Sequence, residues 1–260
     1  MEAKILAIAN QKGGVGKTTT AINLGSALAR RGKKILLVDL DPHGCATLHA
    51  RIYPGGQRLS LREIFLAHDP SLYSRIWPKI IRFSAMEGMD IVPGAIRLSE
   101  LDADYRDRRN KGNVLKNSLD CLRGKYDYMI VDCPPHLGIL LINALVACNL
   151  LLVPIQTDFL ALHGLKLLFD TLNTLDKVLP APVQYRAIAT MFDKRARACS
   201  KVLEILRLKL AGALLRSVVG VDTHFREASA RGCSIFEIDS ESQGAVAYRD
   251  LAEEVLAIWQ

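Results

Sequence analysis

The feature that most constrains this chain is a glycine-rich segment near its start, Lys12-Gly13-Gly14-Val15-Gly16-Lys17-Thr18-Thr19. A short apolar run precedes the segment and a helical pattern follows it, which is the context that a phosphate-binding loop requires. The end of the segment matches the pattern GxxxxGK[ST], but Gln11 stands where that pattern begins with glycine, and a second lysine follows it. The segment therefore predicts a nucleotide site built on a variant phosphate loop, with all of its residues as candidate contacts.

The chemistry of such a loop gives its residues separate roles. Glycine lets backbone N–H groups turn inward, and these groups surround phosphates together with the helix N-terminus. We expect Lys17 to contact the β and γ phosphates of ATP and the Thr18 hydroxyl to bind Mg²⁺. Lys12 cannot easily reach the same γ-phosphate, so we expect it to enter the site of a second copy and assist catalysis there.

Apolar runs of strand length alternate with helical patterns along the chain. The expected strands are Lys4–Ala9, Lys34–Asp39, Met89–Val92, Tyr128–Asp132, Leu150–Ile155 and Tyr185–Met191. The expected helices are Thr18–Arg31, Gly112–Arg123, Leu162–Leu179, Ala196–Leu210 and Glu241–Ile258. The strands show little polar alternation, which predicts an α/β fold with a doubly wound, mostly parallel sheet flanked by helices. No linker rich in Pro, Gly or Ser divides the chain, so we expect one domain over residues 1–260.

Two features bear on the compartment of the protein. The apolar stretch Ile139–Ile155 is short for a membrane span and is interrupted by two asparagines, so a helix followed by a buried strand explains it better. Six cysteines occur without CxxC spacing or a histidine cluster. We therefore expect buried, reduced thiols in a cytoplasmic protein.

Aspartates stand at the ends of two expected strands, where the ligand sites of α/β sheets lie. Asp39 and Asp41 occur in LLVDLDP, and Asp132 occurs in MIVDCPP. We expect Asp132 to hold Mg²⁺, in part through water, and Asp39 to support either the metal or the loop through hydrogen bonds. A turn residue is the alternative for any one of them, but the glycine-rich segment favours a functional role.

The sequence resembles the ParA/Soj branch of the ParA/MinD superfamily of ATPases over nearly its whole length. The similar stretches are IANQKGGVGKTTTAINLGSALARRGKKILLVDLDP, YDYMIVDCPPHLGILLINAL, LLVPIQTDFLALHGLKLL and AYRDLAEEV. The resemblance implies an ATP-sandwich homodimer, slow hydrolysis and a role in positioning DNA or protein cargo. It also implies that Asp41 is catalytic and positions the attacking water.

Two segments depart from the family pattern. The family tetrad DPQG is here Asp41-Pro42-His43-Gly44, and we expect His43 to be a polar loop residue rather than a catalytic one. The family stretch PRNxRLSEA near the adenine is replaced by GVDTHFREA over residues 220–228. The adenine contacts therefore differ from the family pattern in detail, and Arg226 is the residue placed to compensate.

Positive charge gathers in the last third of the chain. Residues 180–235 carry ten Lys/Arg against four Asp/Glu, whereas residues 236–260 carry one Arg against six acids. Arg195, in MFDKRAR, matches an arginine implicated in non-specific DNA binding in ParA-like proteins. The candidate DNA contacts are Arg195, Arg197, Lys201, Arg216, Arg226 and Arg231. We expect salt-sensitive binding of double-stranded DNA that appears mainly with ATP, and an ordinary solvated face is the alternative.

Four functions compete at this point. A cytoplasmic, nucleoid-associated ParA-type switch released by an adaptor protein is favoured. A MinD-like membrane switch is the alternative, but the chain ends in the acidic LAEEVLAIWQ, so we expect no stable membrane anchor. An iron–sulfur redox enzyme would need bridging cysteines, and a scaffold without turnover would not need Lys17, Thr18, Asp41 and Asp132. The cargo is open, and residues 53–112 are the expected partner-specific surface.

Overall fold

The computed structural model describes residues 2–53, 59–105, 112–177, 179 and 181–259. Its centre is an eight-stranded sheet with the strand order β3-β4-β2-β5-β1-β6-β7-β8. The strands are β1 (Lys4–Ile8), β2 (Ile35–Asp39), β3 (Arg82–Phe83), β4 (Met89–Val92), β5 (Tyr128–Asp132), β6 (Leu150–Gln156), β7 (Tyr185–Phe192) and β8 (Leu214–Gly220). Neighbours run parallel except for the β3–β4 pair at one edge. The predicted fold class is confirmed.

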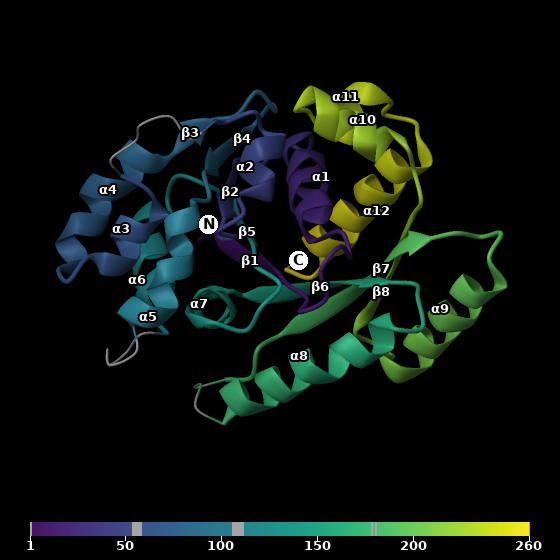
Figure 1. The fold of residues 1–260 in the computed structure, drawn as a ribbon. Coiled ribbons are helices and arrows are strands. Elements are labelled where there is room, and N and C mark those ends of the chain that lie inside the picture. The colour runs from purple at the N-terminus through teal and green to yellow at the C-terminus, as the bar shows by residue number, and fades with distance from the viewer. Residues whose placement is uncertain (1, 54–58, 106–111, 178, 180, 260) are drawn as a thin grey trace.

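Helices cover both faces of this sheet (Figure 1). One face carries α1 (Lys17–Ala29), α2 (Cys45–His49), α10 (His224–Arg231), α11 (Ile235–Ile238) and α12 (Gln243–Ala257). The other face carries α3 (Leu61–Leu66), α4 (Tyr73–Ile80), α5 (Leu101–Asp104), α6 (Val114–Leu119), α7 (Ile139–Ala147), α8 (Ala161–Asp176) and α9 (Arg197–Lys209). Short 3₁₀ turns lie at Pro70–Leu72 (η1), Ile96–Glu100 (η2) and Asp120–Leu122 (η3).

The period-two alternation of the strands explains why both faces are apolar. In β1, Leu6 and Ile8 contribute to the core beneath α1 and α12, while Ile5 and Ala7 contribute to the core on the opposite face. All four side chains are fully buried. A strand buried on both faces needs apolar residues at every position, which is why the sequence shows runs here and not alternation.

The element boundaries differ from the expected ones mainly at sheet edges and in short helices. Sequence patterns did not indicate β3 or β8. The helix expected over Gly112–Arg123 is shorter, because α6 ends at Leu119 and the chain continues as η3. The stretch Ile139–Ile155 is α7 followed by β6, as expected, and no helix within the described residues is long and apolar enough to cross a membrane.

The register of the parallel strands gathers the candidate carboxylates at one edge of the sheet. Asp39 at the end of β2 pairs with Asp132 at the end of β5, and Asp132 pairs with Ile8 at the end of β1. The glycine-rich segment leaves β1 at this same edge and enters α1. The fold therefore places the loop, Asp39 and Asp132 side by side at the carboxyl ends of the central strands.

Candidate nucleotide site

The loop between β1 and α1 is held by its flanks and open at its tip. Asn10 donates to the backbone oxygen of Pro154 at 2.8 Å and accepts from the Lys12 amide at 2.9 Å. The backbone oxygen of Val15 accepts from the Thr190 hydroxyl at 2.9 Å. Gly14 and Gly16 adopt φ values of 73° and 90°, the left-handed region that glycine enters without strain. No atom lies within 4 Å of a Cβ built at either glycine, so the loop backbone faces open space.

The two lysines of the loop point to different places. Lys17 is 8% exposed, and its Nζ donates to the backbone oxygen of Lys12 at 3.3 Å. Burial lowers the pKa of Lys17, while the nearby carboxylates of Asp132 and Asp41 act in the opposite direction. The Nζ of Lys12 instead lies 3.7 Å from the carboxylate of Asp158, in a partly exposed ion pair. Lys17 is thus directed into its own site, and Lys12 is not.

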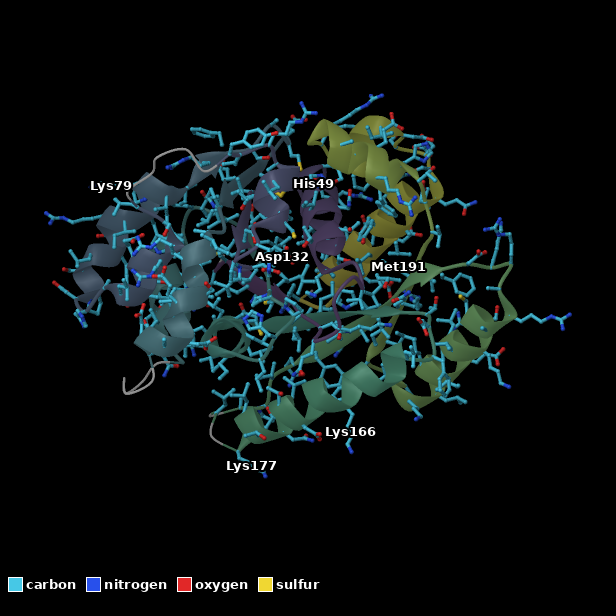
Figure 2. All side chains as sticks on the ribbon, viewed as in Figure 1. His49, Lys79, Asp132, Lys166, Lys177 and Met191 are labelled. Carbon is cyan, nitrogen blue, oxygen red and sulfur yellow. The ribbon has the colours of Figure 1, made fainter. Side chains whose placement is uncertain are left out.

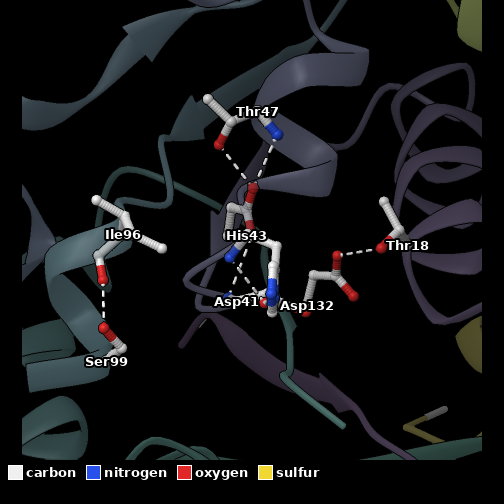
Figure 3. Close-up of polar contacts among 8 residues, drawn as sticks. Thr18, Asp41, His43, Thr47, Ile96, Ser99 and Asp132 are labelled. Atoms are coloured by element: carbon white, nitrogen blue, oxygen red, sulfur yellow. Dashed lines mark hydrogen bonds and ion pairs between the residues drawn. The ribbon is translucent and has the colours of Figure 1, made fainter. Parts of the chain in front are cut away.

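Asp132 and Thr18 form the part of the site that fits a divalent cation. The Thr18 hydroxyl donates to Asp132 Oδ2 at 2.7 Å (Figure 3). The other oxygen, Asp132 Oδ1, is buried and has no hydrogen-bond partner within the described residues. Burial raises the pKa of Asp132 well above its usual range, and the charge of Asp39 adds to the effect. A hydroxyl beside an unpaired carboxylate oxygen is an oxygen donor set suited to Mg²⁺, which takes its remaining ligands from phosphates and water.

No larger ligand cluster accompanies this pair. Within the described parts of the chain, no three His, Cys, Asp or Glu side chains are grouped so as to hold a metal ion. The expectation that all six cysteines are buried was wrong: Cys133 is buried, Cys148, Cys199 and Cys233 are half-buried, and Cys45 and Cys121 are exposed. Cys45 begins α2 and faces the cavity beside the loop, and Cys121 lies in the short η3 turn at the surface.

Asp39 organises the loop that follows β2. Its carboxylate accepts from the Thr47 amide at 2.8 Å, the Thr47 hydroxyl at 2.6 Å and the Asp41 amide at 3.2 Å. Burial raises the pKa of Asp39 to about 6, and the hydrogen bonds from Thr47 limit the rise. Of the two roles expected for Asp39, this geometry favours support of the loop through hydrogen bonds.

Asp41 lies at the mouth of the site and is 9% exposed. Its Oδ1 accepts from the backbone amide of His43 at 2.9 Å and contacts the ring Nδ1 of His43 at 3.0 Å (Figure 3). Sequence reasoning treated His43 as a polar loop residue and did not indicate this contact. The contact depends on a tight turn over residues 41–44, in which Gly44 has a φ of 63° and its amide donates to the Asp41 carbonyl oxygen at 2.9 Å. Asp, Pro and Gly at these positions are typical of such a turn, so the residue pattern indicates the turn but not the ring contact.

Two adjoining cavities extend from the loop. A cavity of about 570 Å³ is lined by the loop glycines, Lys17, Asp41, Cys45 and Pro135, and a second of about 500 Å³ is lined by Gln156, Thr190, residues 219–222, Arg226 and Tyr248. Phe225 and Met191 border both. Figure 2 shows Met191 and Asp132 on either side of the start of α1. The first cavity suits phosphates, and the second suits a planar base.

The second cavity contains residues that the sequence indicated and residues that it did not. The run at 220–228, expected near the adenine, lines it through Gly220–Asp222, Phe225 and Arg226. Met191, with a strained φ of 54°, and Tyr248, whose ring packs edge-on against Phe225 at 5.7 Å, were missed. The missed residues come from β7 and α12, far from the loop in sequence, and no local motif marks them.

The candidate DNA contacts fall into groups around the β8 edge of the sheet. Arg195, Arg197 and Lys201 lie on or just before α9, which covers one face, and Arg226 and Arg231 lie on α10, which covers the other. Arg216 projects from β8 between them and is 92% exposed. The structure therefore distributes these residues along an edge and does not form one compact patch.

Acidic neighbours accompany several of these arginines. Arg195 makes a two-point contact with Asp193, Arg231 pairs with Glu227 at 2.6 Å, and Arg216 lies 3.6 Å from Glu254. Within the described residues, Arg197 and Lys201 form no ion pair, and both are exposed on α9. Arg226 on α10 is likewise exposed and forms no ion pair within the described residues, so these three side chains have the least competition for a phosphate.

Comparisons with known proteins agree over most of the chain. The family model of an AAA domain matches residues 3–184. The sporulation initiation inhibitor protein Soj of Bacillus subtilis is 36% identical over 98% of both chains, and the chromosome partitioning protein ParA of Caulobacter vibrioides is 32% identical over 98% of this chain and 94% of its own. The crystal structure of cobyrinic acid a,c-diamide synthase from Mycobacterium smegmatis, with an ATP analogue and magnesium, superposes with a TM-score of 0.83 at 31% identity. The superposition covers 99% of this chain and 96% of the synthase chain.

Proposed function

The chain belongs to the ParA/Soj branch of the ParA/MinD family of ATPases, and from this premise we propose how its positioning cycle runs. ATP closes two copies around their nucleotides, and the dimer binds double-stranded DNA without sequence preference. An adaptor protein then stimulates hydrolysis, and the dimer separates and leaves the DNA. The cargo is DNA or a large protein assembly in the cytoplasm, at the nucleoid.

The observation that carries this proposal is the contact between Thr18 and Asp132 beneath the open loop. The amides of residues 12–19 bind the phosphates, and Lys17 contacts the β and γ phosphates from its buried position. Thr18 and the unpaired Oδ1 of Asp132 hold Mg²⁺ directly or through water. The metal, when bound, neutralises charge on the transferred phosphate. Asp41 positions the attacking water.

The homodimer is proposed from the geometry of Lys12. Its ammonium group is held only by a partly exposed ion pair with Asp158, and such pairs contribute about 0–1 kcal/mol. Lys12 can therefore leave Asp158 at little cost and enter the partner's site, where its charge would stabilise the developing charge of the reaction. This arrangement makes hydrolysis depend on dimerisation.

DNA binding is proposed along the β8 edge. Arg197 and Lys201 share one face of α9 and are unpaired within the described residues, so phosphate contacts there displace no ion pair. A dimer presents two such edges, and simultaneous engagement raises the effective affinity. We therefore expect binding that is weak for one copy and stronger for the ATP-bound pair.

A membrane-bound cycle has less support. The apolar residues of α12 include Leu251 and Val255, which are fully buried against the sheet. Trp259 packs against Tyr128 with ring centroids 5.8 Å apart, and the Lys4 ammonium lies over its ring. This helix therefore has no free apolar face to place in a lipid surface. Flotation with anionic vesicles and ATP would reveal a membrane-bound cycle instead.

The adaptor surface stays a proposal for residues 53–112. Residues 54–58 and 106–111, which include most of YPGG and much of the polar run 103–113, lie outside the described residues. Among the described ones, Phe83 on the edge strand β3 is 93% exposed and Ile96 is 67% exposed. Exchange of this segment with that of a relative should exchange the adaptor.

The cycle is tested by the mass of the protein in solution with ATP, with ADP and without nucleotide. We expect a dimer only with Mg-ATP, and its loss in Lys17→Ala, which cannot hold the phosphates. In Lys12→Ala we expect ATP binding to persist while hydrolysis is lost. A monomer in every nucleotide state would contradict the proposed cycle.

A further inference from the structure

His43 makes the one side-chain hydrogen bond that the Asp41 carboxylate receives within the described residues. Both the main-chain amide and the ring Nδ1 of His43 meet the same oxygen, Asp41 Oδ1, at 2.9 and 3.0 Å. An ionised carboxylate can only accept, so the ring nitrogen that faces it carries the proton. The ring of His43 therefore presents Nδ1–H to Asp41.

The rest of the structure fixes the backbone of Asp41 but not its carboxylate. The Asp41 amide donates to Asp39, and the Asp41 carbonyl oxygen accepts from the Gly44 amide at 2.9 Å. A Cβ at Gly94 would lie 2.7 Å from that carbonyl oxygen, so the loop after β4 closes on the same peptide. Residue 43 therefore sets the orientation of the carboxylate: its main-chain amide holds Oδ1 whatever the side chain, and the histidine ring adds a second donor to the same oxygen. With Oδ1 occupied, Oδ2 is left to accept from water.

We infer that His43 is a positioning residue for hydrolysis, which holds the Asp41 carboxylate so that Oδ2 orients the attacking water. This inference rests on the proposed role of Asp41 in the ATPase cycle. It replaces the expectation that His43 is a polar loop residue without a part in the reaction. His43 does not touch the nucleotide in this role, since its ring acts through Asp41.

The His43 side chain is 73% exposed, so its replacement removes the contact with Asp41 without opening the core. The charged or titratable groups around the Asp41–His43 pair are Lys17 of α1, Asp39 of β2, Asp132 of β5 and Cys45 of α2. Arg97, in the η2 turn after β4, pairs instead with Glu100.

The test is steady-state hydrolysis of Mg-ATP with double-stranded DNA. The variants are His43→Ala, His43→Gln and, as a matched control, His68→Ala, which removes an exposed histidine outside the site. We expect His43→Ala to lower kcat about tenfold, with KM and the affinity for a fluorescent ATP analogue within about twofold. His43→Gln, whose side-chain amide donates in place of the ring Nδ1, should keep kcat within about threefold of the wild type.

Two results would overturn the inference: an unchanged kcat in His43→Ala, or a kcat in His43→Gln as low as that in His43→Ala. Asp41→Ala separates this outcome from failure of the proposed function. If the wild type hydrolyses ATP and Asp41→Ala does not, the proposed role of Asp41 stands and the His43 result judges the inference alone. If Asp41→Ala hydrolyses ATP like the wild type, the role of Asp41 fails as well.

Discussion

Two buried aspartates at the carboxyl ends of neighbouring strands differ in whether their carboxylates are satisfied by the fold. The Asp132 carboxylate is fully buried, and its Oδ1 has no hydrogen-bond partner within the described residues. This oxygen therefore adds no stability to the fold unless a cation binds it. Asp39 is equally buried, but three hydrogen bonds satisfy it. The same chemical group is therefore structural at one strand end and available to a ligand at the other.

Asp132→Asn should stabilise the nucleotide-free protein and abolish its stabilisation by Mg²⁺. The folded pKa of Asp132 is raised above its unfolded value, so the stability that its proton supplies is lost as pH rises. The asparagine carries no charge, so it removes the cost of burying an ionised carboxylate and raises the free energy of unfolding by on the order of 1 kcal/mol. This increase should be larger near pH 8 than near pH 5. Thermal unfolding at both pH values, with and without Mg-ATP, measures the effect. A lower melting temperature of the variant at the higher pH would refute it.

The ion pair between Lys12 and Asp158 leads to a second prediction at this scale. Asp158→Asn frees Lys12 in the single copy, so the equilibrium with Mg-ATP should move towards the dimer by a few-fold, consistent with a pair worth up to about 1 kcal/mol. Sedimentation velocity at several protein concentrations measures the shift. Asp170→Asn, an exposed acid on α8, serves as the charge-matched control. An equal shift in both variants would assign the effect to net charge and not to Lys12.

The residues found from sequence and those missed differ in how their geometry is encoded. The loop residues Gly16, Lys17 and Thr18 have fixed spacing, because one backbone turn must present its amides and two side chains to phosphate. The contact between His43 and Asp41 instead arises from a turn in which the His43 ring folds back onto the carboxylate of the residue two positions earlier. Met191 and Tyr248 reach the site only through the packing of β7 and α12, which no local pattern records.

At the scale of elements, central strands were predictable and edge elements were not. Strands β2 and β5 are buried at every residue and β1 at every residue after Lys4, so their apolar runs are unambiguous. The edge strand β8 mixes buried and exposed positions and carries Arg216 and Ser217, so it resembles a loop in sequence. The four- to six-residue helices α2, α3 and α5 are too short to display a helical period.

The packing of α1 on the sheet gives a prediction for this scale. A Cβ at Gly25 would lie 2.9 Å from the Met89 sulfur and 3.4 Å from Ile130, so glycine allows the helix to approach the strands. Gly25→Val should therefore lower the free energy of unfolding by about 1–3 kcal/mol and shift the loop at the start of α1. Gly124→Ala, where a Cβ meets nothing within 4 Å, should stay within about 0.5 kcal/mol. Denaturant titration compares the two, and equal stabilities would contradict the packing argument.

At the scale of the whole molecule, the residues of the nucleotide site and the candidate DNA contacts lie in different places around one continuous sheet. The site lies at the carboxyl ends of the central strands, and α9 and α10 flank the β8 edge (Figure 1). Residues 220–231 take part in both, since Gly220 and Phe225 line the base cavity while Arg231 is exposed on α10. We propose that residues 1–260 form one domain through this continuous sheet. A nucleotide-dependent change in the dimer would then reach the charged edge through rigid elements.

The most direct test of this account is retention on random double-stranded DNA with ATP, with ADP and without nucleotide, at two salt concentrations. Arg197→Ala/Lys201→Ala removes two exposed cations that share one face of α9. The matched control Arg75→Ala/Lys79→Ala removes the same charge from α4, at the opposite end of the molecule (Figure 2). We expect retention of the wild type and the control only with ATP, weakened by salt, and its loss in the α9 variant. Equal retention with ATP and ADP, or none in any state, would contradict the claim that ATP controls DNA binding.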